Sequence, residues 1–370
     1  MSFTYDTLAI QFTGIVLIFL LLQFTVLIIY TYFHRWLLNY RKEKKADSEE
    51  YILPLIYRYL DGGISELDFS DALRNHYDIV VAFENIDDMI DSLRGKEREK
   101  LKKLLNLSAF REHFLKKIKS NAVMDIAEAC MYSEKKKETD SEVIKKLYDL
   151  QSHNRPVIVY AATLALINSS KQEIRDYALT SFLHSPQNAS MAVNDIIYKY
   201  CELHPDKDQA AEFLMEQVSS SEIPVKNASA ATRMFNDLNF YQLTEPLFEL
   251  FCSPLPHDEL GQLRATLLSV LNQLPAPEVK EELFRQRLWE SDYQMVRLET
   301  ARWIYQHHTP DLDDMLLALC GDDDLEVRIV AQKALLQYSN LPQPETHIPE
   351  KYQQEWQEIK KIGDTHVNII

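Results

Sequence analysis

The side chains best suited to metal chemistry are carboxylates near the C-terminal end of the chain. Three consecutive acids follow three others closely: Asp322, Asp323 and Asp324 come after Asp311, Asp313 and Asp314. A calcium loop alternates its ligands and ends in a bidentate Glu, and this run has neither feature. We therefore expect these carboxylates to accept backbone N–H groups at helix N-termini, where acids are favoured.

No other pattern of reactive residues appears. The eleven histidines are scattered, and the adjacent pair His307-His308 points in two directions on a helix, so it cannot chelate one metal as an i, i+4 pair can. No G-x-G-x-x-G, G-x-x-x-x-G-K, H-E-x-x-H or G-x-S-x-G motif occurs. The sequence predicts no catalytic residue, no cofactor, no metal site and no small-molecule substrate.

The most basic stretch of the chain runs from Arg94 to Lys119, where three acids oppose ten basic residues. These are Arg94, Lys96, Arg98, Lys100, Lys102, Lys103, Arg111, Lys116, Lys117 and Lys119. One interpretation is a pair of solvated helices whose lysines flank apolar core positions. The other is contact with anionic lipid, which contributes about 1 kcal/mol per basic residue at the membrane surface. The sequence leaves both open.

Charge is unevenly distributed over the chain, whose formal net charge is −16. Residues 94–146 contain fifteen Lys or Arg and nine Asp or Glu, whereas residues 147–370 contain eighteen and thirty-three. Because Lys and Arg supply most of the affinity for phosphate backbones, the acidic part is a poor nucleic-acid binder.

Composition indicates an all-α fold. Only seven of the 370 residues are glycine, too few for the turns of a β-rich or doubly wound α/β domain. The four cysteines, Cys130, Cys201, Cys252 and Cys320, are isolated from one another. We expect reduced core cysteines, as is usual in a cytoplasmic compartment.

These elements are tethered by an apolar N-terminal segment. Phe12 to Tyr30 contains no charged residue, and about 20 helical residues cross a bilayer. Basic residues occur only after this run, which places the N-terminus outside and the rest in the cytoplasm. A cleaved signal sequence would need a basic start and a small-residue cleavage site, and neither is present. Gln23 is compatible with a partner helix in the membrane or with a lone span.

Helices are predicted between this span and residue 139. Ser48 is expected to cap a short helix that ends at Asp61-Gly62-Gly63, and Ser65 to begin another. Within Asp78–Leu93, apolar residues recur mostly at spacings of three and four, which predicts an amphipathic helix.

An internal repeat follows from about residue 140 to 340. Its strongest copies begin at Leu325, Tyr293 and Leu260, and weaker ones begin at Glu222 and Gln172. The basic residues that align are Arg328, Arg297, Arg264, Lys226 and Arg175, and the last two are separated by an interval of 51 positions. The run from Arg155 is of the same type but has no Arg at this place. We expect a structural role for these basic residues, although a ligand-binding role on a shared face is the alternative.

In each copy an aliphatic residue precedes the basic one, and a small or apolar residue follows it three positions later, as in Val327, Arg328 and Ala331. Asp or Ser stands just upstream of the copies that begin at Leu325, Tyr293 and Glu222. This pattern resembles the second helix of HEAT repeats. The resemblance implies an armadillo-like α-solenoid of helical hairpins that binds macromolecules. An irregular armadillo-like or tetratricopeptide-like superhelix is the alternative.

The predicted organisation is therefore a transmembrane anchor with a basic tail (1–46), a helical, partly basic membrane-proximal region (47–139), a HEAT-like α-solenoid (140–340), and a linker with a capping helix (341–370). We expect a non-catalytic, single-pass scaffold of the inner (plasma) membrane that binds a membrane-associated protein. It resembles bacterial anchored HEAT proteins of envelope complexes, such as exopolysaccharide-synthesis machines. A HEAT-like enzyme or lyase and an anionic-lipid sensor are the alternatives.

Overall fold

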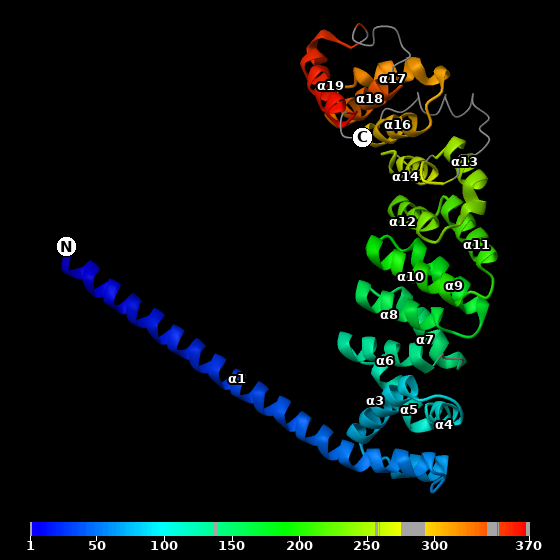
Figure 1. Ribbon diagram of the computed structural model, residues 1–370. Helices are drawn as coiled ribbons and strands as arrows, with labels where there is room; N and C mark the ends of the chain where they lie inside the picture. Colours follow the sequence, from blue (N-terminus) through cyan, green and yellow to red (C-terminus); the bar gives the residue numbers. More distant parts are fainter. Residues whose placement is uncertain are drawn as a thin grey trace. The chain divides into compact units, whose positions relative to one another are not determined.

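The computed structural model describes residues 2–136, 140–255, 258, 260–274, 293–338, 346 and 348–367, with the backbone alone for residues 2–18, 91, 311 and 362–367 (Figure 1). Within these ranges the regular secondary structure is helical and contains no strand, so the all-α prediction is confirmed. The chain divides into two compact units, Met1–Ser120 (unit 1) and Asn121–Ile370 (unit 2).

Unit 1 begins with one long helix, α1 (Ser2–Leu60). The prediction that Ser48 caps a separate helix is wrong, because α1 continues through Ser48 and buries it. The Lys-, Glu- and Ala-containing sequence before it favours helix and contains no breaker. The predicted helix end is confirmed: Gly62 has a φ of 79°, and the Gly63 N–H donates to the Arg58 carbonyl at 2.8 Å. Glycine adopts this left-handed conformation without steric cost.

The N-terminal part of α1 is a candidate membrane span. The helix is long and apolar enough to cross a bilayer, and its apolar side chains from Phe19 to Trp36 are exposed. The hydroxyls of Thr25 and Thr31 donate to carbonyls four residues earlier, at 2.8 and 2.7 Å. These bonds satisfy the two hydroxyls within the helix, as a position in hydrocarbon requires.

Four shorter helices complete unit 1: α2 (Glu66–Ala72), α3 (His76–Ser92), α4 (Lys96–Leu104) and α5 (Ser108–Ile118). The predicted Ser65 cap is confirmed and forms a capping box with Asp68. Helix α3 is amphipathic as predicted, although it begins at His76 with Asn75 as its cap. It packs on α1. The core of unit 1 contains Ile52, Ile56, Phe69, Ile86, Leu101 and Phe110.

Unit 2 contains a row of helices that is referred to below simply as the row. Its members are α6 (Val123–Lys136), α8 (Pro156–Ile167), α10 (Ser190–Leu203), α12 (Val225–Asp237), α14 (Gln262–Leu271), α16 (Gln294–Gln306) and α18 (Leu325–Gln337). Each of them contacts the next (Figure 1). Their first residues follow one another at intervals of 33, 34, 35, 37, 32 and 31 residues.

Hydrogen bonds between side chains connect neighbouring helices of the row at matching positions along their lengths. Asn168 on α8 donates to Glu134 on α6, and Tyr160 on α8 donates to Asp195 on α10. These partners are 34 and 35 residues apart, close to the interval between helix starts. The helices α6, α8 and α10 therefore run in the same direction and nearly in register.

Flanking helices pack on the row. They are α7 (Ser141–Gln151), α9 (Gln172–His184), α11 (Lys207–Ser219), α13 (Thr244–Cys252) and α17 (Asp313–Cys320). Each contacts the member of the row that follows it in the chain. The short turns η1 (Tyr241–Leu243) and η2 (Pro310–Leu312) precede α13 and α17.

The structure corrects the predicted repeat alignment in two places. The copy from Gln172 is α9, a flanking helix, whereas α10 occupies the row between α8 and α12. This explains the interval of 51 positions from Arg175 to Lys226, because one row helix, α10, lies between them in the chain. The copy from Glu222 begins at Val225, with Pro224 and not a serine at the N-cap. The row also includes α6, which precedes the predicted start at residue 140.

The C-terminal end of the row contacts a final helix, α19 (Gln353–Val367), which follows the turn η4 (Glu350–Tyr352). Trp356 and Ile359 of α19 are buried. This position fits the predicted cap for the last repeat, although most of the predicted linker lies outside the described residues. Ala331 on α18 is fully buried, as its place in the repeat predicts.

Candidate functional site

Two of the repeated basic residues join successive helices. The Nε and Nη2 atoms of Arg297 on α16 donate to the two carboxylate oxygens of Asp322, at 2.6 and 3.2 Å. Arg328 on α18 makes a similar fork with Glu355 of α19, at 3.2 and 3.1 Å, and its Nη1 donates to the Asp322 carbonyl at 2.7 Å. Such two-point pairs fix both position and orientation of the guanidinium group. Both guanidinium groups are therefore held by protein contacts.

The other basic residues of the repeat do not share one face. Arg175 lies on the flanking helix α9 and donates to the Leu203 carbonyl at the end of α10. Lys226 on α12 donates to the Asn188 carbonyl at 2.9 Å, and Arg264 is half-buried on α14. The contacts of Arg175 and Lys226 with backbone carbonyls fit the predicted structural role, and Arg297 and Arg328 pair with a neighbouring acid.

The acidic run before α18 is occupied by protein contacts. Asp324 caps α18 by accepting the Glu326 and Val327 N–H groups at 3.0 and 3.1 Å. Burial by itself would raise the pKa of Asp322, but hydrogen bonds from Arg297 and from the Asp324 N–H outweigh burial and hold that pKa below its usual value. Asp323 contacts Lys351 at 3.3 Å.

The histidine pair lies at the C-terminal end of α16. His307 is the C-cap residue of that helix. His308 contacts Asp313 at 2.7 Å and stacks on Tyr338. Among the described residues, no group of three or more His, Cys, Asp or Glu is arranged to hold a metal ion.

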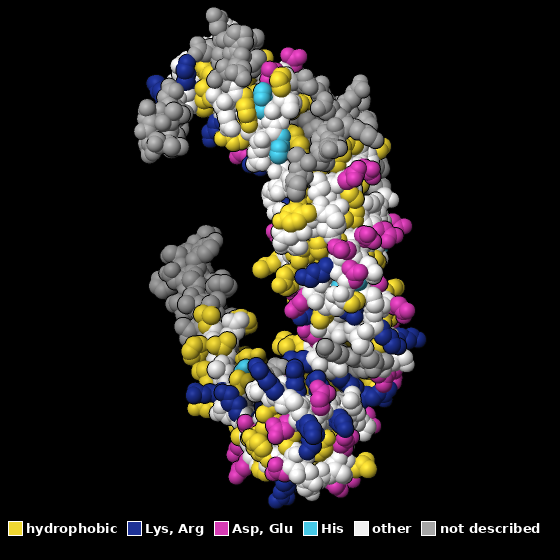
Figure 2. Space-filling model, turned by 45° about the vertical axis from the view of Figure 1, so that its right-hand side comes forward, with side chains coloured by type: hydrophobic (Ala, Val, Ile, Leu, Met, Phe, Trp, Pro, Cys, Tyr) yellow, Lys and Arg dark blue, Asp and Glu magenta, His cyan; other side chains and the backbone are white. Residues whose placement is uncertain are grey.

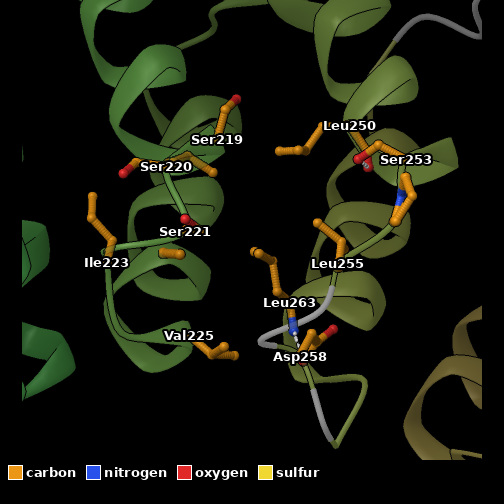
Figure 3. A pocket seen from close by; sticks show the side chains of 13 residues that line it. Ser219, Ser220, Ser221, Ile223, Val225, Leu250, Ser253, Leu255, Asp258 and Leu263 are labelled. Carbon is orange, nitrogen blue, oxygen red and sulfur yellow. Dashed lines mark hydrogen bonds between the residues drawn. The ribbon is translucent and has the colours of Figure 1, made fainter.

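A small pocket opens between the loop after α11 and the loop after α13 (Figure 3). It has a volume of about 120 Å³, and its described lining consists of serines, apolar residues, one proline and Asp258. The two carboxylate oxygens of Asp258 accept the Leu263 and Arg264 N–H groups at 3.1 and 2.8 Å. Asp258 therefore caps α14. The described lining contains no histidine or lysine, and its one carboxylate is engaged by backbone N–H groups.

The basic stretch Arg94–Lys119 forms α4, α5 and their flanks in unit 1, and Figure 2 shows Lys and Arg side chains gathered over this part of the surface. Its apolar residues Leu101, Leu104, Phe110, Phe114 and Ile118 are buried, as the solvated-helix interpretation requires. Within the stretch, Lys100 donates to the Leu60 carbonyl at 2.6 Å and Lys102 pairs with Glu99 at 2.7 Å.

The attachment of Lys100 bears on lipid contact. It fixes α4 beside Leu60, and the helix from Tyr40 to Leu60 is about 30 Å long at 1.5 Å per residue. That length is several times the Debye length of about 8 Å at physiological salt. Contact between α4 and a bilayer thus requires a strongly tilted or bent α1.

Two histidines that are remote in sequence meet in unit 1. The Nδ1 atoms of His76 and His113 are 3.3 Å apart, and the ring centroids are 4.7 Å apart. No sequence motif indicates this pair, because the two histidines are 37 positions apart and the end of α3 and the whole of α4 lie between them.

A polar cluster that the sequence analysis missed lies on α6, α8 and α10. Glu134 accepts from Asn168 at 3.4 Å, and Tyr160 donates to Asp195. Burial raises the pKa of Glu134, and nearby Asp195 adds to the rise while Lys199 opposes it. Burial and the Asp195 hydrogen bond raise the pKa of Tyr160 to about 12. The spacing of 34 and 35 residues across the repeat was the available signal.

Large apolar side chains are exposed on the same three helices. Met191 is 84% exposed, Met124 is 78% exposed and Val157 is 61% exposed, each at the second residue of its helix. Seven residues further along α10 and α6, Tyr198 and Met131 are also exposed. Scattered exposed apolar residues are ordinary, but a contiguous patch marks an interaction site.

The described cysteines are free thiols; Cys130, Cys201 and Cys320 are buried as predicted, whereas Cys252 is only half-buried. Burial raises the pKa of Cys130, Cys201 and Cys320 to about 12 in each case. Thiols with such a pKa are protonated at neutral pH and are therefore poor nucleophiles.

No protein-family model matches the chain, and the search of curated proteins finds no match. The function proposed for this chain therefore depends on its own geometry. The aligned basic residues are engaged in contacts within the protein, and large apolar side chains are exposed on α6, α8 and α10.

Proposed function

We propose that the chain is a membrane-anchored, non-catalytic scaffold. In this proposal α1 holds the protein in the plasma membrane, with the N-terminus outside and units 1 and 2 in the cytoplasm. Unit 2 is an α-solenoid of HEAT-like hairpins that offers its surface to a membrane-associated protein. The resemblance of the repeats makes an envelope complex, such as an exopolysaccharide-synthesis machine, the first place to look for that protein.

The regular intervals between row helices support the solenoid. Seven helices start 31 to 37 residues apart, each contacts the next, and a flanking helix packs on most of them. In a repeat protein each unit buries its apolar face against its neighbours, and the stack leaves an extended surface for binding.

The observation that carries the scaffold proposal is the exposed apolar face of α6, α8 and α10. Exposure of Met124, Met191 and Tyr198 to water contributes nothing to folding. Burial of such side chains in a complex stabilises that complex by about 25 cal/mol for each Å² of apolar surface removed from water. An interaction surface explains why three adjacent helices expose large apolar side chains at matching positions.

The topology is tested by protease treatment of intact cells whose outer barrier has been removed. Units 1 and 2 should be spared until the membrane is permeabilised. Digestion without permeabilisation would reverse the proposed orientation.

The scaffold role is tested with a photo-reactive amino acid placed in the full chain in its native membrane. At Met191 it should cross-link to another protein, whereas at Asp314, an exposed position on α17, it should not. If positions on every face of unit 2 fail to give a heterologous cross-link, the scaffold proposal is wrong.

A further inference from the structure

Three helices of the row present matched apolar positions. Met124, Val157 and Met191 form one line across α6, α8 and α10, and Met131, Leu164 and Tyr198 form a second line seven residues further along each helix. Leu164 is half-buried and the other five side chains are exposed. The contacts Glu134–Asn168 and Tyr160–Asp195 show that the three helices are nearly in register. The corresponding residues therefore lie at similar heights on the face.

The dimensions of this face suit one helix. Seven residues span about 10 Å along a helix, and packed helices are about 8–10 Å apart. The two apolar lines are thus about 10 Å apart and extend for about 20 Å across α6, α8 and α10. A helix with its side chains is about 10–12 Å wide, and about 14 residues of it cover 20 Å. Methionine adapts its shape to an apolar partner, which favours its use on such a surface.

The charges between the two lines are acidic. The intermediate positions on the three helices are Glu128, Ala161 and Asp195. Glu134 lies nearby, where burial and Asp195 disfavour its charged form more than Lys199 favours it. A cation brought to this place would stabilise both Glu134 and Asp195, because opposite charges attract more strongly where water is excluded.

The next helix of the row ends the apolar face. On α12 the positions that correspond to Met191 and Tyr198 are Lys226 and Arg233. Lys226 donates to the Asn188 carbonyl, and Arg233 is exposed. The apolar lines therefore stop after α10, and a bound helix would meet positive charge if it extended further.

We propose that the face of α6, α8 and α10 binds an amphipathic helix of a partner protein that carries Lys or Arg beside its apolar stripe. This inference rests on the proposed scaffold function and names the chemistry of its partner. The apolar stripe packs on the lines containing Met124 and Met131, and the basic side chains pair with Asp195 and Glu134. The helix crosses α6, α8 and α10 instead of running along one of them.

The probe is a labelled synthetic helix of about 14 residues with leucine on one face and lysine beside it, held helical by a side-chain cross-link. Its binding to the full chain in detergent is followed by fluorescence anisotropy. A second peptide has glutamate in place of every lysine. We expect the basic peptide to bind at least tenfold more tightly than the acidic one, and more weakly as salt rises.

Matched variants locate the site. The double variant Met191→Ser with Tyr198→Ser should weaken binding of the basic peptide at least tenfold. The control variant Tyr177→Ser with Tyr241→Ser, which removes comparably exposed apolar side chains outside α6, α8 and α10, should bind like the parent. Glu134→Gln should weaken binding while raising the melting temperature, a combination that a merely structural role does not produce.

Equal binding of the two peptides, or equal binding by the two double variants, would overturn the proposal. If the double variant Met191→Ser with Tyr198→Ser loses self-association, the face binds a second copy of the chain. If the same variant loses binding to vesicles, the face binds lipid. Either result overturns the assignment to a basic helix. The scaffold proposal fails separately, if no position on unit 2 cross-links to another protein in the native membrane.

Discussion

We expect substitution of Asn227 on α12 to reduce the free energy of unfolding more than substitution of most other polar residues. Its side chain is fully buried, and its Nδ2 donates to the Leu183 and Ser185 carbonyls at 2.8 and 2.7 Å. These carbonyls lie at the C-terminal end of the flanking helix α9, where helix carbonyls lack partners within the helix. Asn227 therefore ties a row helix to the hairpin before it.

The cost of Asn227→Ala follows from these contacts. A buried group left without a hydrogen bond costs about 1–3 kcal/mol, so two carbonyls give about 2–6 kcal/mol. The Oδ1 of Asn227 has no partner in the described structure, and its removal offsets part of this loss. We expect a net destabilisation of about 2–3 kcal/mol, which lowers the melting temperature of a unit of this size by about 5–10 °C.

The assay is thermal unfolding of the full chain in detergent, followed by circular dichroism. Asn236→Ala is the matched control, because Asn236 lies on the same helix and makes one exposed hydrogen bond, to Gln273 at 2.6 Å. It should change stability by about 0.5 kcal/mol or less. Asn227→Asp should be worse than Asn227→Ala, since it places a carboxylate against two carbonyl oxygens. Equal melting temperatures for the two alanine variants would refute the reasoning.

Four further outcomes are expected. Ala331→Asp should cost several kcal/mol because it buries an unpaired carboxylate, whereas Lys333→Asp at an exposed position of the same helix should not, as urea unfolding will show. The pKa of Asp322 is lowered in the folded state, so the stability that its carboxylate contributes is present above the ordinary pKa of 3.8 and is lost as the pH falls below that value. Asp322→Asn should therefore destabilise the folded chain at neutral pH and weaken the fall of the melting temperature with acidification. The pKa of Glu134 is raised in the folded state, so the stability that its protonated form contributes is present below the ordinary pKa of 4.5 and is lost as the pH rises through the pKa of the folded state. Glu134→Gln should therefore raise the melting temperature at pH 7 but not at about pH 4. A chain beginning at Ser48 should sediment weakly with phosphatidylserine vesicles at low salt, and replacement of Lys102, Lys103, Lys116 and Lys117 by Gln should abolish this, with Lys100 kept because it binds the Leu60 carbonyl.

Local features of the chain were accessible from the sequence. The scarcity of glycine and the spacing of apolar residues predicted an all-α fold, and the structure confirms it. The Ser65 cap, the Gly62 turn and the buried Ala331 were predicted for the same reason: each depends on residues within one or two helical turns. The apolar run in α1 is likewise a matter of composition and length alone.

The packing between helices decided the rest. Gln172 begins a helix whose sequence resembles the row helices, yet α9 flanks the row and α10 occupies it. A helix pattern shows which side chains are apolar but not which neighbour covers them. The pairing of Tyr160 with Asp195 and the meeting of His76 with His113 also depend on packing between helices remote in sequence. The spacing of apolar residues determines which side of each helix is buried. Which helix packs against that side, and at what height, is decided only when the helices assemble.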